Sequence, residues 1–271
     1  MELQTHFGRH EETLGDLETL LLGYELPQHS ALVVGVGLDQ LPVFEWLQND
    51  VKAKQPFWLQ QKYSWEYLEV AAVLERLGKP WTLTVVDSSP EVCEAVQRQE
   101  VIVIDDAYGK SGYAKRFLET LGVGGYDDKM LRTVSTALES SKILNRVEVC
   151  NEVNIPSAIR EKITVICGGI QNLGELALLH DIYDVITVFN VFQHIPDFND
   201  KTKAGHALGR RVSEKGIIVA DLKFYGFPQI RTPRVNEYKD YGPESELITH
   251  TYITYFMGKP KALSAEAPLR V

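Results

Sequence analysis

Apolar residues follow two alternating periods along the chain, which predict strands and helices in turn. Short runs rich in Val, Ile and Leu predict buried strands, and apolar residues spaced by three or four predict amphipathic helices. The predicted strands are 32–36, 81–86, 163–167, 183–189, 217–221 and 247–256, with 101–104 as either a further strand or a packing segment. The predicted helices are 12–24, 61–77, 90–99, 114–121, 129–144, 175–180 and 202–212, and another is expected to open at 43–47.

Strands that alternate with helices predict a mostly parallel sheet covered on both faces. We therefore expect an α/β, Rossmann-like, doubly wound fold with seven strands in a mostly parallel sheet. Residues 1–30 are expected to form an N-terminal helical arm, 31–258 the main domain and 259–271 a tail. The stretch from about 108 to 155 is longer than a crossover needs, so we interpret it as a helical insertion.

Composition narrows the class of protein. The 37 acidic residues exceed the 28 basic ones and give a net charge of −9, which disfavours a general nucleic-acid binder. The cysteines, Cys93, Cys150 and Cys167, are odd in number, widely spaced and without a Cys-x-x-Cys pair. They indicate neither a zinc site nor a disulfide framework, and they favour a reducing cytoplasm. With no apolar run of about 18 residues and no signal-peptide core, we expect a cytoplasmic protein with no membrane partner.

Candidate chemistry gathers where the first two predicted strands end. Gly35 and Gly37 follow the first strand, and glycine permits a tight positive-φ turn that a ligand can approach. Asp87 ends the second strand. In doubly wound folds a ligand lies beyond the carboxyl ends of the strands, where such an acid can accept both ribose hydroxyls of an adenosine-type cofactor. The alternative is that Asp87 only caps the helix that begins at Ser88-Ser89-Pro90.

The glycine turn lacks the features that hold phosphates. A dinucleotide fingerprint needs a third glycine, which is absent here, and Asp39 would repel a phosphate. These residues suit a cofactor with adenine and ribose but no phosphate, such as S-adenosylmethionine.

Two further segments are similar to a known family. The segment from Phe189 to Asp197, which contains Asn190-Val191 and His194-Ile195, lies at the tip of a predicted strand, with a helix and the strand 217–221 after it. That order resembles the fourth and fifth motifs of class I S-adenosylmethionine-dependent methyltransferases. Thr5-x-Phe7-x-Arg9 before a leucine-rich helix, Pro42 and Asn172-Leu173 are similar in layout to the chemoreceptor glutamate methyltransferases, the CheR type.

The resemblance implies roles for individual residues. Thr5 and Arg9 would contact the methionine end of the cofactor, Asn172 and Leu173 the adenine region, and Asn190 would lie near the methyl group. The chain also departs from the CheR pattern. Gln40-Leu41 replaces paired glutamates, Phe189 replaces an arginine, and His194 stands where that family has a tyrosine. The resemblance therefore implies the fold and cofactor rather than the substrate.

Methyl transfer relies on alignment of the reacting groups, with a base where the acceptor must lose a proton. His194 is the candidate base, because the ordinary pKa of histidine lies near neutrality; the alternative is a loop histidine bonded to backbone. We expect a methyltransferase that acts on an oxygen or nitrogen atom of a small molecule or protein side chain. The alternatives are a catalytically inactive protein that binds S-adenosylmethionine or its demethylated product, and an NAD-dependent oxidoreductase.

Overall fold

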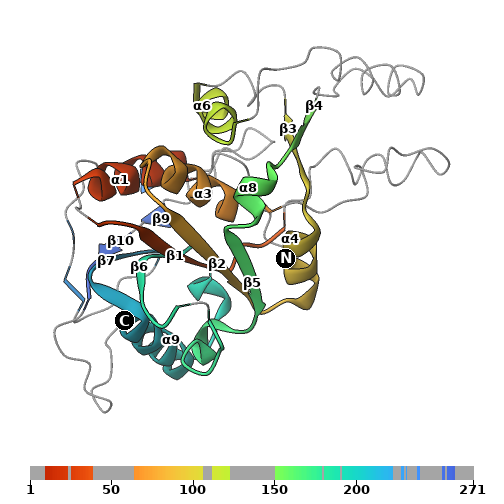
Figure 1. Ribbon diagram of the computed structural model, residues 1–271. Coiled ribbons are helices and arrows are strands. Elements are labelled where there is room, and N and C mark those ends of the chain that lie inside the picture. The colour runs from red at the N-terminus through yellow and green to blue at the C-terminus, as the bar shows by residue number, and fades with distance from the viewer. Residues whose placement is uncertain are drawn as a thin grey trace.

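The main sheet has six strands among the residues that the structure describes. The computed structural model describes residues 10–23, 26–38, 64–105, 112–122, 150–178, 180–189, 191–221, 227–228, 230, 237–238, 252–253 and 255–259. The strand order is β10-β7-β6-β1-β2-β5 (Figure 1). Their bounds are β1 His29–Val34, β2 Trp81–Asp87, β5 Ile163–Cys167, β6 Tyr183–Val188, β7 Val212–Ala220 and β10 Tyr255–Met257. Neighbouring strands are parallel except for β10, which runs antiparallel to β7. The prediction of a mostly parallel α/β sheet is confirmed, and a seventh strand is not among the described residues.

Two pairs of short strands lie outside the main sheet. β3 (Val101–Asp105) pairs antiparallel with β4 (Cys150–Asn154), so 101–104 is a strand, but of a separate ribbon. β8 (Glu237–Tyr238) pairs with β9 (Tyr252–Ile253). The predicted terminal strand 247–256 is therefore divided in its described part, because β9 belongs to this ribbon and β10 to the main sheet.

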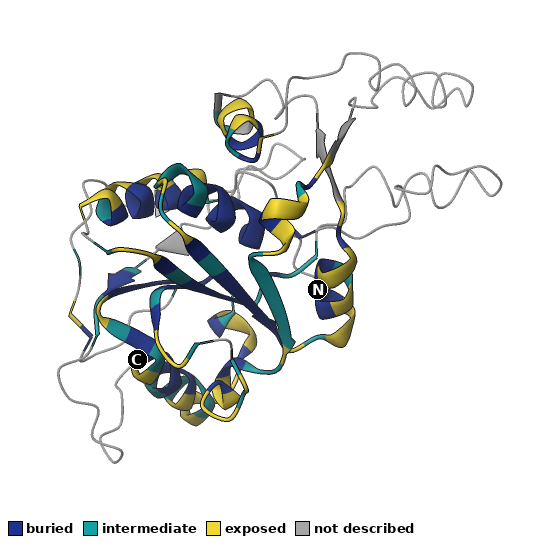
Figure 2. Cartoon of the chain, in the orientation of Figure 1, coloured by how far each residue is buried: buried dark blue, intermediate teal, exposed yellow. Residues whose placement is uncertain are grey.

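Helices cover both faces of the sheet, as the continuous run of apolar residues in β1 requires. Ala31 and Val33 belong to one buried cluster, while Leu32 and Val34 belong to the other. The first face carries α1 (Glu11–Leu22), α3 (Glu66–Arg76) and α4 (Pro90–Arg98), with α6 (Gly112–Thr120) and α8 (Ser157–Arg160) adding to the same cluster. The second carries α9 (Phe198–Arg211) and the 3₁₀ turns η2 (Ile170–Asn172) and η3 (Phe192–His194). Figure 2 shows the buried strands between these two layers.

Local signals set several helix starts. Ser89 caps α4, with its Oγ accepting the Val92 N–H at 3.4 Å, and Pro90 opens the helix as predicted. Asp197 caps α9 in the same way, so this helix begins before the predicted residue 202. It also passes directly into β7, which places Gly216 inside a strand rather than in the predicted turn.

Two helix predictions need correction. The predicted helix 175–180 is wrong, because its described residues form a turn, a bend and irregular chain after η2. Leu176 and Leu178 pack against the second core without a helix. The helix predicted from residue 61 begins at Glu66. The predicted helices at 43–47 and 129–144 lie outside the described residues.

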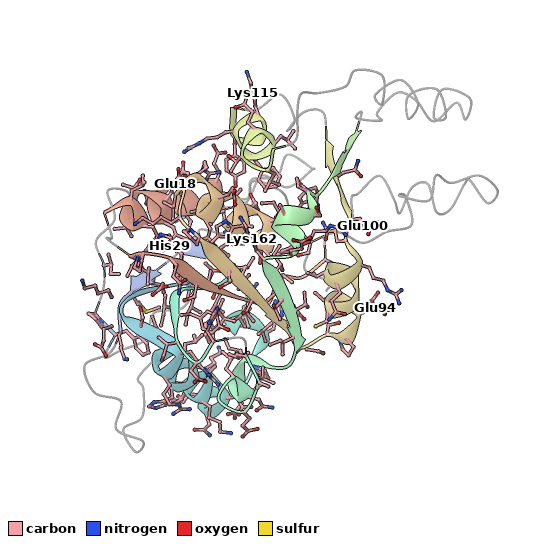
Figure 3. The ribbon with its side chains drawn as sticks, in the orientation of Figure 1. Glu18, His29, Glu94, Glu100, Lys115 and Lys162 are labelled. Atoms are coloured by element: carbon pink, nitrogen blue, oxygen red, sulfur yellow. The ribbon has the colours of Figure 1, made fainter. Side chains whose placement is uncertain are left out.

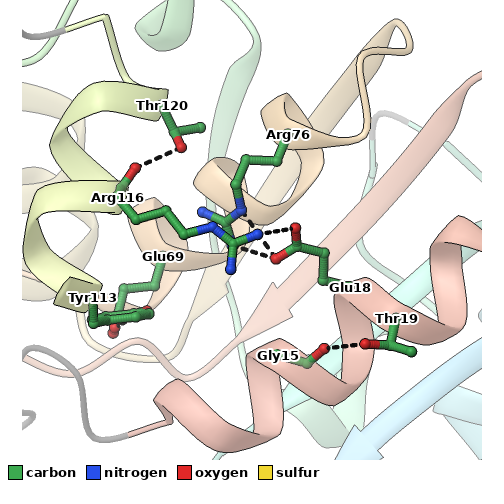
Figure 4. A network of polar contacts seen from close by, with 8 residues as sticks. All are labelled: Gly15, Glu18, Thr19, Glu69, Arg76, Tyr113, Arg116 and Thr120. Carbon is green, nitrogen blue, oxygen red and sulfur yellow. Dashed lines mark hydrogen bonds and ion pairs between the residues drawn. The ribbon is translucent and has the colours of Figure 1, made fainter.

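Glu18 joins three helices of the first face (Figure 4). Its Oε2 accepts Nε and Nη2 of Arg76 from α3 at 3.0 and 2.8 Å, and its Oε1 accepts Nη2 of Arg116 from α6 at 2.6 Å. A second link comes from Tyr113, whose hydroxyl donates to Glu69 Oε1 at 2.6 Å. Burial raises the pKa of Tyr113, and the neighbouring Glu69 raises it further. These contacts fix α6 against α1 and α3.

No described helix is long and apolar enough to cross a membrane.

Candidate cofactor site

The order in which strands are added to the main sheet reverses at β1. This strand has β2 on one side and β6 on the other, and both neighbours run parallel to it. Chain segments leave the carboxyl ends of β1 and β6 to opposite sides, which forms the topological switch point where doubly wound folds bind their ligands. The residues that follow β1, β2, β5 and β6 are therefore the candidate site.

Gly35 is required by its own packing. Its φ is +75°, and a Cβ there would collide with the side chain of Val191, which follows β6. Gly37 also has a positive φ, of 56°. The sequence predicts that Gly35 leaves room for a ligand, but Val191 fills that space. The glycine joins the turn after β1 to the turn after β6.

Asp87 holds the backbone of this glycine turn. The side chain is 9% exposed. Its Oδ2 accepts the Val36 N–H at 3.1 Å, and its Oδ1 accepts the Ser89 N–H at 2.8 Å. A carboxylate has about four acceptor positions, so among the described residues these two donors leave one position on each oxygen. The N-cap of α4 is Ser89. Asp87 binds the backbone of that N-cap and, through Val36, also holds the glycine turn, so its role goes beyond the start of the helix.

A buried serine and glutamine anchor the turn from behind. Ser64 Oγ donates to the Val36 carbonyl at 3.2 Å. Gln99 in turn accepts the Ser64 N–H at 3.1 Å and donates to the Ser64 carbonyl at 3.2 Å. Both side chains are almost wholly buried. The entry to α3 and the end of α4 therefore set the position of Val36.

Asn172 and Leu173 follow β5 and differ in exposure. Asn172 is exposed at the end of η2, whereas Leu173 is fully buried in the second core. The Leu173 carbonyl accepts Nη2 of Arg211 at 3.0 Å. Asn172 is thus available to a ligand beside β5, and Leu173 supports it from below.

His194 is exposed at the end of η3, where its backbone N–H donates to the Val191 carbonyl at 3.0 Å. It follows β6, as expected, at the same edge as Asp87. Thr5, Arg9 and Asn190 lie outside the described residues.

A second histidine at this edge is held far more firmly than His194. The His10 ring stacks on Phe189, with 4.0 Å between ring centroids and 14° between planes. Its Nε2 lies 3.3 Å from Oε1 of Glu66, a carboxylate that is 2% exposed. A ring fixed by a buried acid is the base-and-orienter arrangement of acid–base catalysis. No sequence pattern predicts this cluster, because its three residues come from distant segments and His10 precedes the first helix.

No group of three His, Cys, Asp or Glu side chains within the described part of the chain is arranged to hold a metal ion.

No family model matches the chain, and no curated protein matches it in sequence. It is similar in structure to the N-methyltransferase NodS from Bradyrhizobium japonicum WM9, at 10% identity and TM-score 0.41, over 93% of this chain and 97% of that one. The glycopeptide N-methyltransferase MtfA complexed with sinefungin gives 10% identity and TM-score 0.37 over 96% and 74%. MtNAS in complex with MTA and tNA gives 12% and 0.36 over 93% and 60%. At such values the likeness is one of general layout, so the contacts around Asp87 remain the basis for a function.

Proposed function

We propose that this chain is an S-adenosylmethionine-dependent methyltransferase that transfers a methyl group to an oxygen or nitrogen atom of a small molecule or protein side chain. The observation that carries the proposal is the pair of backbone hydrogen bonds on Asp87. They aim a nearly buried carboxylate beyond the end of β2 and, as far as the described residues go, leave one acceptor position on each oxygen. Two such positions suit the two donors of a ribose diol.

The same contact distinguishes a nucleoside from a dinucleotide. Val36 is the middle residue of the Gly35-Val36-Gly37 turn, and its N–H donates to Asp87. That amide is therefore not available to a pyrophosphate, and the adjacent carboxylate would repel one. This favours a cofactor that carries adenosine without phosphate, and it counts against the NAD-dependent alternative.

We expect different residues around Asp87 to contact different parts of the proposed cofactor. Asp87 would hold the ribose, and Asn172, with Leu173 beneath it, would lie beside the adenine. By resemblance, Thr5 and Arg9 would meet the methionine end and Asn190 the methyl group. The cofactor supplies an electrophilic methyl group on a sulfonium sulfur.

Two histidines are candidates to take a proton from the acceptor. His194 has the exposed position after β6 and can reach a substrate from solvent. His10 has the fixed position, stacked on Phe189 and bonded to Glu66. Because a base must be aligned with the proton it removes, we favour His10 and keep His194 as the alternative.

Glutamate side chains are not the acceptor that we propose. The CheR-type pattern has an arginine where this chain has Phe189, and the Phe189 ring is already engaged by His10. No guanidinium at that position can form the bidentate pair that a substrate carboxylate would accept.

Calorimetric titration with S-adenosylmethionine, S-adenosylhomocysteine and NAD tests the proposal. We expect both sulfur nucleosides to bind and NAD to give no heat. Absence of binding by both sulfur nucleosides would overturn the proposal. A panel of amines and phenols, with S-adenosylhomocysteine formation as the readout, then separates an enzyme from the inactive binder: tight binding without turnover of any acceptor would favour the inactive protein.

A further inference from the structure

Two cysteines that are distant in sequence lie together at the carboxyl end of β2. Cys167 is the last residue of β5 and pairs in register with Asp87 on β2. Cys93 lies in α4 and reaches the same place from the face that this helix covers. The neighbouring Cys167 thiol raises the pKa of Cys93, so the two side chains are near enough to interact.

The two thiols differ in their access to solvent. Cys167 is exposed, whereas Cys93 is 4% exposed. The Cys93 thiol donates to the Asp87 carbonyl at 3.3 Å, and its sulfur lies 3.9 Å from the Ile166 carbonyl. The Cys167 sulfur is therefore accessible to a dissolved oxidant, whereas the Cys93 sulfur is buried.

We propose that Cys93 and Cys167 form a peroxide-sensitive pair that closes into a disulfide beside Asp87. In the first step the Cys167 sulfur gives an electron pair to one oxygen of hydrogen peroxide, the O–O bond breaks, and a sulfenic acid and one water form. In the second step the Cys93 sulfur attacks the Cys167 sulfur, the S–O bond breaks, and the disulfide and a second water form. Both sulfurs are oxidised, and one peroxide is reduced to two waters.

The second step is the slow one. Burial raises the pKa of Cys93 to about 12, and the neighbouring Cys167 thiol adds to that effect. Attack requires the thiolate, so closure is expected to speed up as pH rises from 7 to 9.

Closure changes what holds Asp87. Its carbonyl accepts the Cys93 S–H and, at 2.8 Å, the Gly168 N–H. A disulfide removes the S–H donor and ties α4 to the segment that leads from β5 to Asn172. If the proposed function holds, nucleoside affinity falls by about tenfold on oxidation and returns with dithiothreitol. The disulfide itself does not depend on that function.

The experiment uses the full chain with Cys150→Ser, which leaves only the two cysteines in question. The protein is treated with hydrogen peroxide without any nucleoside, alkylated, digested without reduction and analysed by mass spectrometry. We expect a Cys93–Cys167 disulfide that dithiothreitol reverses and that forms faster at pH 9 than at pH 7. Cys167 carried to sulfinic acid with Cys93 still reduced would overturn the proposal.

Single variants check the order of events. Cys93→Ser should leave Cys167 as a sulfenic acid that dimedone traps, and Cys167→Ser should leave Cys93 unmodified at the same peroxide concentration. Modification of Cys93 in Cys167→Ser would contradict the order proposed. A mapped disulfide without nucleoside binding would leave the thiol pair standing and overturn only the proposed function.

Discussion

Two aspartates at opposite edges of the same sheet use their carboxylates differently. At the amino edge, Asp184 Oδ2 accepts both the N–H and the hydroxyl of Ser30 at 3.0 Å, and its Oδ1 accepts the Ser213 hydroxyl at 3.1 Å. The Asp184 N–H donates to the Ser30 Oγ at 3.2 Å. At the carboxyl edge, Asp87 accepts one backbone N–H on each oxygen. Asp184 thus accepts three donors and joins β1, β6 and β7, whereas Asp87 accepts two backbone donors and, within the described part of the chain, keeps more acceptor positions.

The amino edge is closed by charged side chains as well. Glu75 accepts Nζ of Lys162 at 2.8 Å and Nε1 of Trp81 at 2.6 Å. Burial alone would raise the Glu75 pKa, but these two donors outweigh it and lower the pKa. The difference between the edges teaches that a polar residue at a strand end indicates a site only when its neighbours leave it unsaturated.

The largest expected effect comes from Gly35→Ala, compared with Gly78→Ala. Both glycines have a positive φ, of 75° and 66°, but a Cβ at Gly78 meets nothing within 4 Å, whereas one at Gly35 meets Val191. We expect Gly78→Ala to lower the free energy of unfolding by about 1 kcal/mol, and Gly35→Ala by about 3–4 kcal/mol because overpacking adds to the backbone strain. Urea unfolding measures both.

Val191→Ala supplies the control for that comparison. In the Gly35→Ala background it should recover part of the loss, since the residue that collides becomes smaller. Equal losses for Gly35→Ala and Gly78→Ala would show that Val191 does not restrict the turn.

The next effect separates the two aspartates. Asp87→Ala should weaken binding of S-adenosylhomocysteine several hundredfold, because it removes hydrogen bonds to a charged acceptor worth roughly 1.5–3 kcal/mol each. Asp184→Ala should leave that affinity within about twofold and lower stability by roughly 1–3 kcal/mol. Calorimetry and urea unfolding on both variants give the two readouts. Equal affinity losses in the two variants would mean that Asp87 only holds the backbone together and does not bind the ligand.

The sequence predicts Asp87 better than it predicts the rest of the site. A run of Thr, Leu and Val at 82–86 identifies β2, and its tip must lie at the carboxyl edge in any doubly wound sheet. The packing of Val191 on Gly35 and the stacking of His10 on Phe189 join distant segments. Such contacts depend on strand order and side-chain packing, which hydrophobic periodicity does not encode.

The wrong prediction of a turn at Lys215-Gly216 has a similar cause. Lys215-Gly216 has the composition of a turn, yet Gly216 lies inside β7, where a Cβ would meet Val212, Ser213 and the Asp184 carbonyl. Val212 pairs with Tyr183 and Ile217 with Val185, so β7 is irregular between these pairs, and crowding within this stretch accounts for the glycine. Local composition could not distinguish an irregularity within a strand from a turn between elements.

The two histidines of the carboxyl edge give the third prediction. His10→Phe keeps a ring that can stack on Phe189 and removes the nitrogen that meets Glu66. With an acceptor that the wild type methylates, we expect kcat to fall about a hundredfold while S-adenosylhomocysteine affinity stays within about threefold. His194→Asn should keep kcat within about threefold. The reverse result would move the base to His194.

The smallest effect belongs to a histidine of the amino edge, His29, labelled in Figure 3. It is 1% exposed, and neither ring nitrogen has a hydrogen-bond partner among the described residues. Burial lowers its pKa, Lys79 lowers it further, and Asp184 opposes them. The unfolded chain therefore binds a proton near pH 6.5 that the folded chain does not, and stability falls as pH drops below about 6.5.

One proton limits that slope to about 1.4 kcal/mol per pH unit. Chemical unfolding of the wild type between pH 7.5 and pH 5 should show the loss, and His29→Leu should show a shallower slope over the same range, whatever its stability at pH 7.5. Glu75 cannot produce this difference, because its lowered pKa places its own loss of stability below about pH 4.5. Parallel pH profiles for wild type and His29→Leu would mean that His29 accepts its proton in the folded state. The amino edge would then be more open to solvent than the burial of His29 indicates.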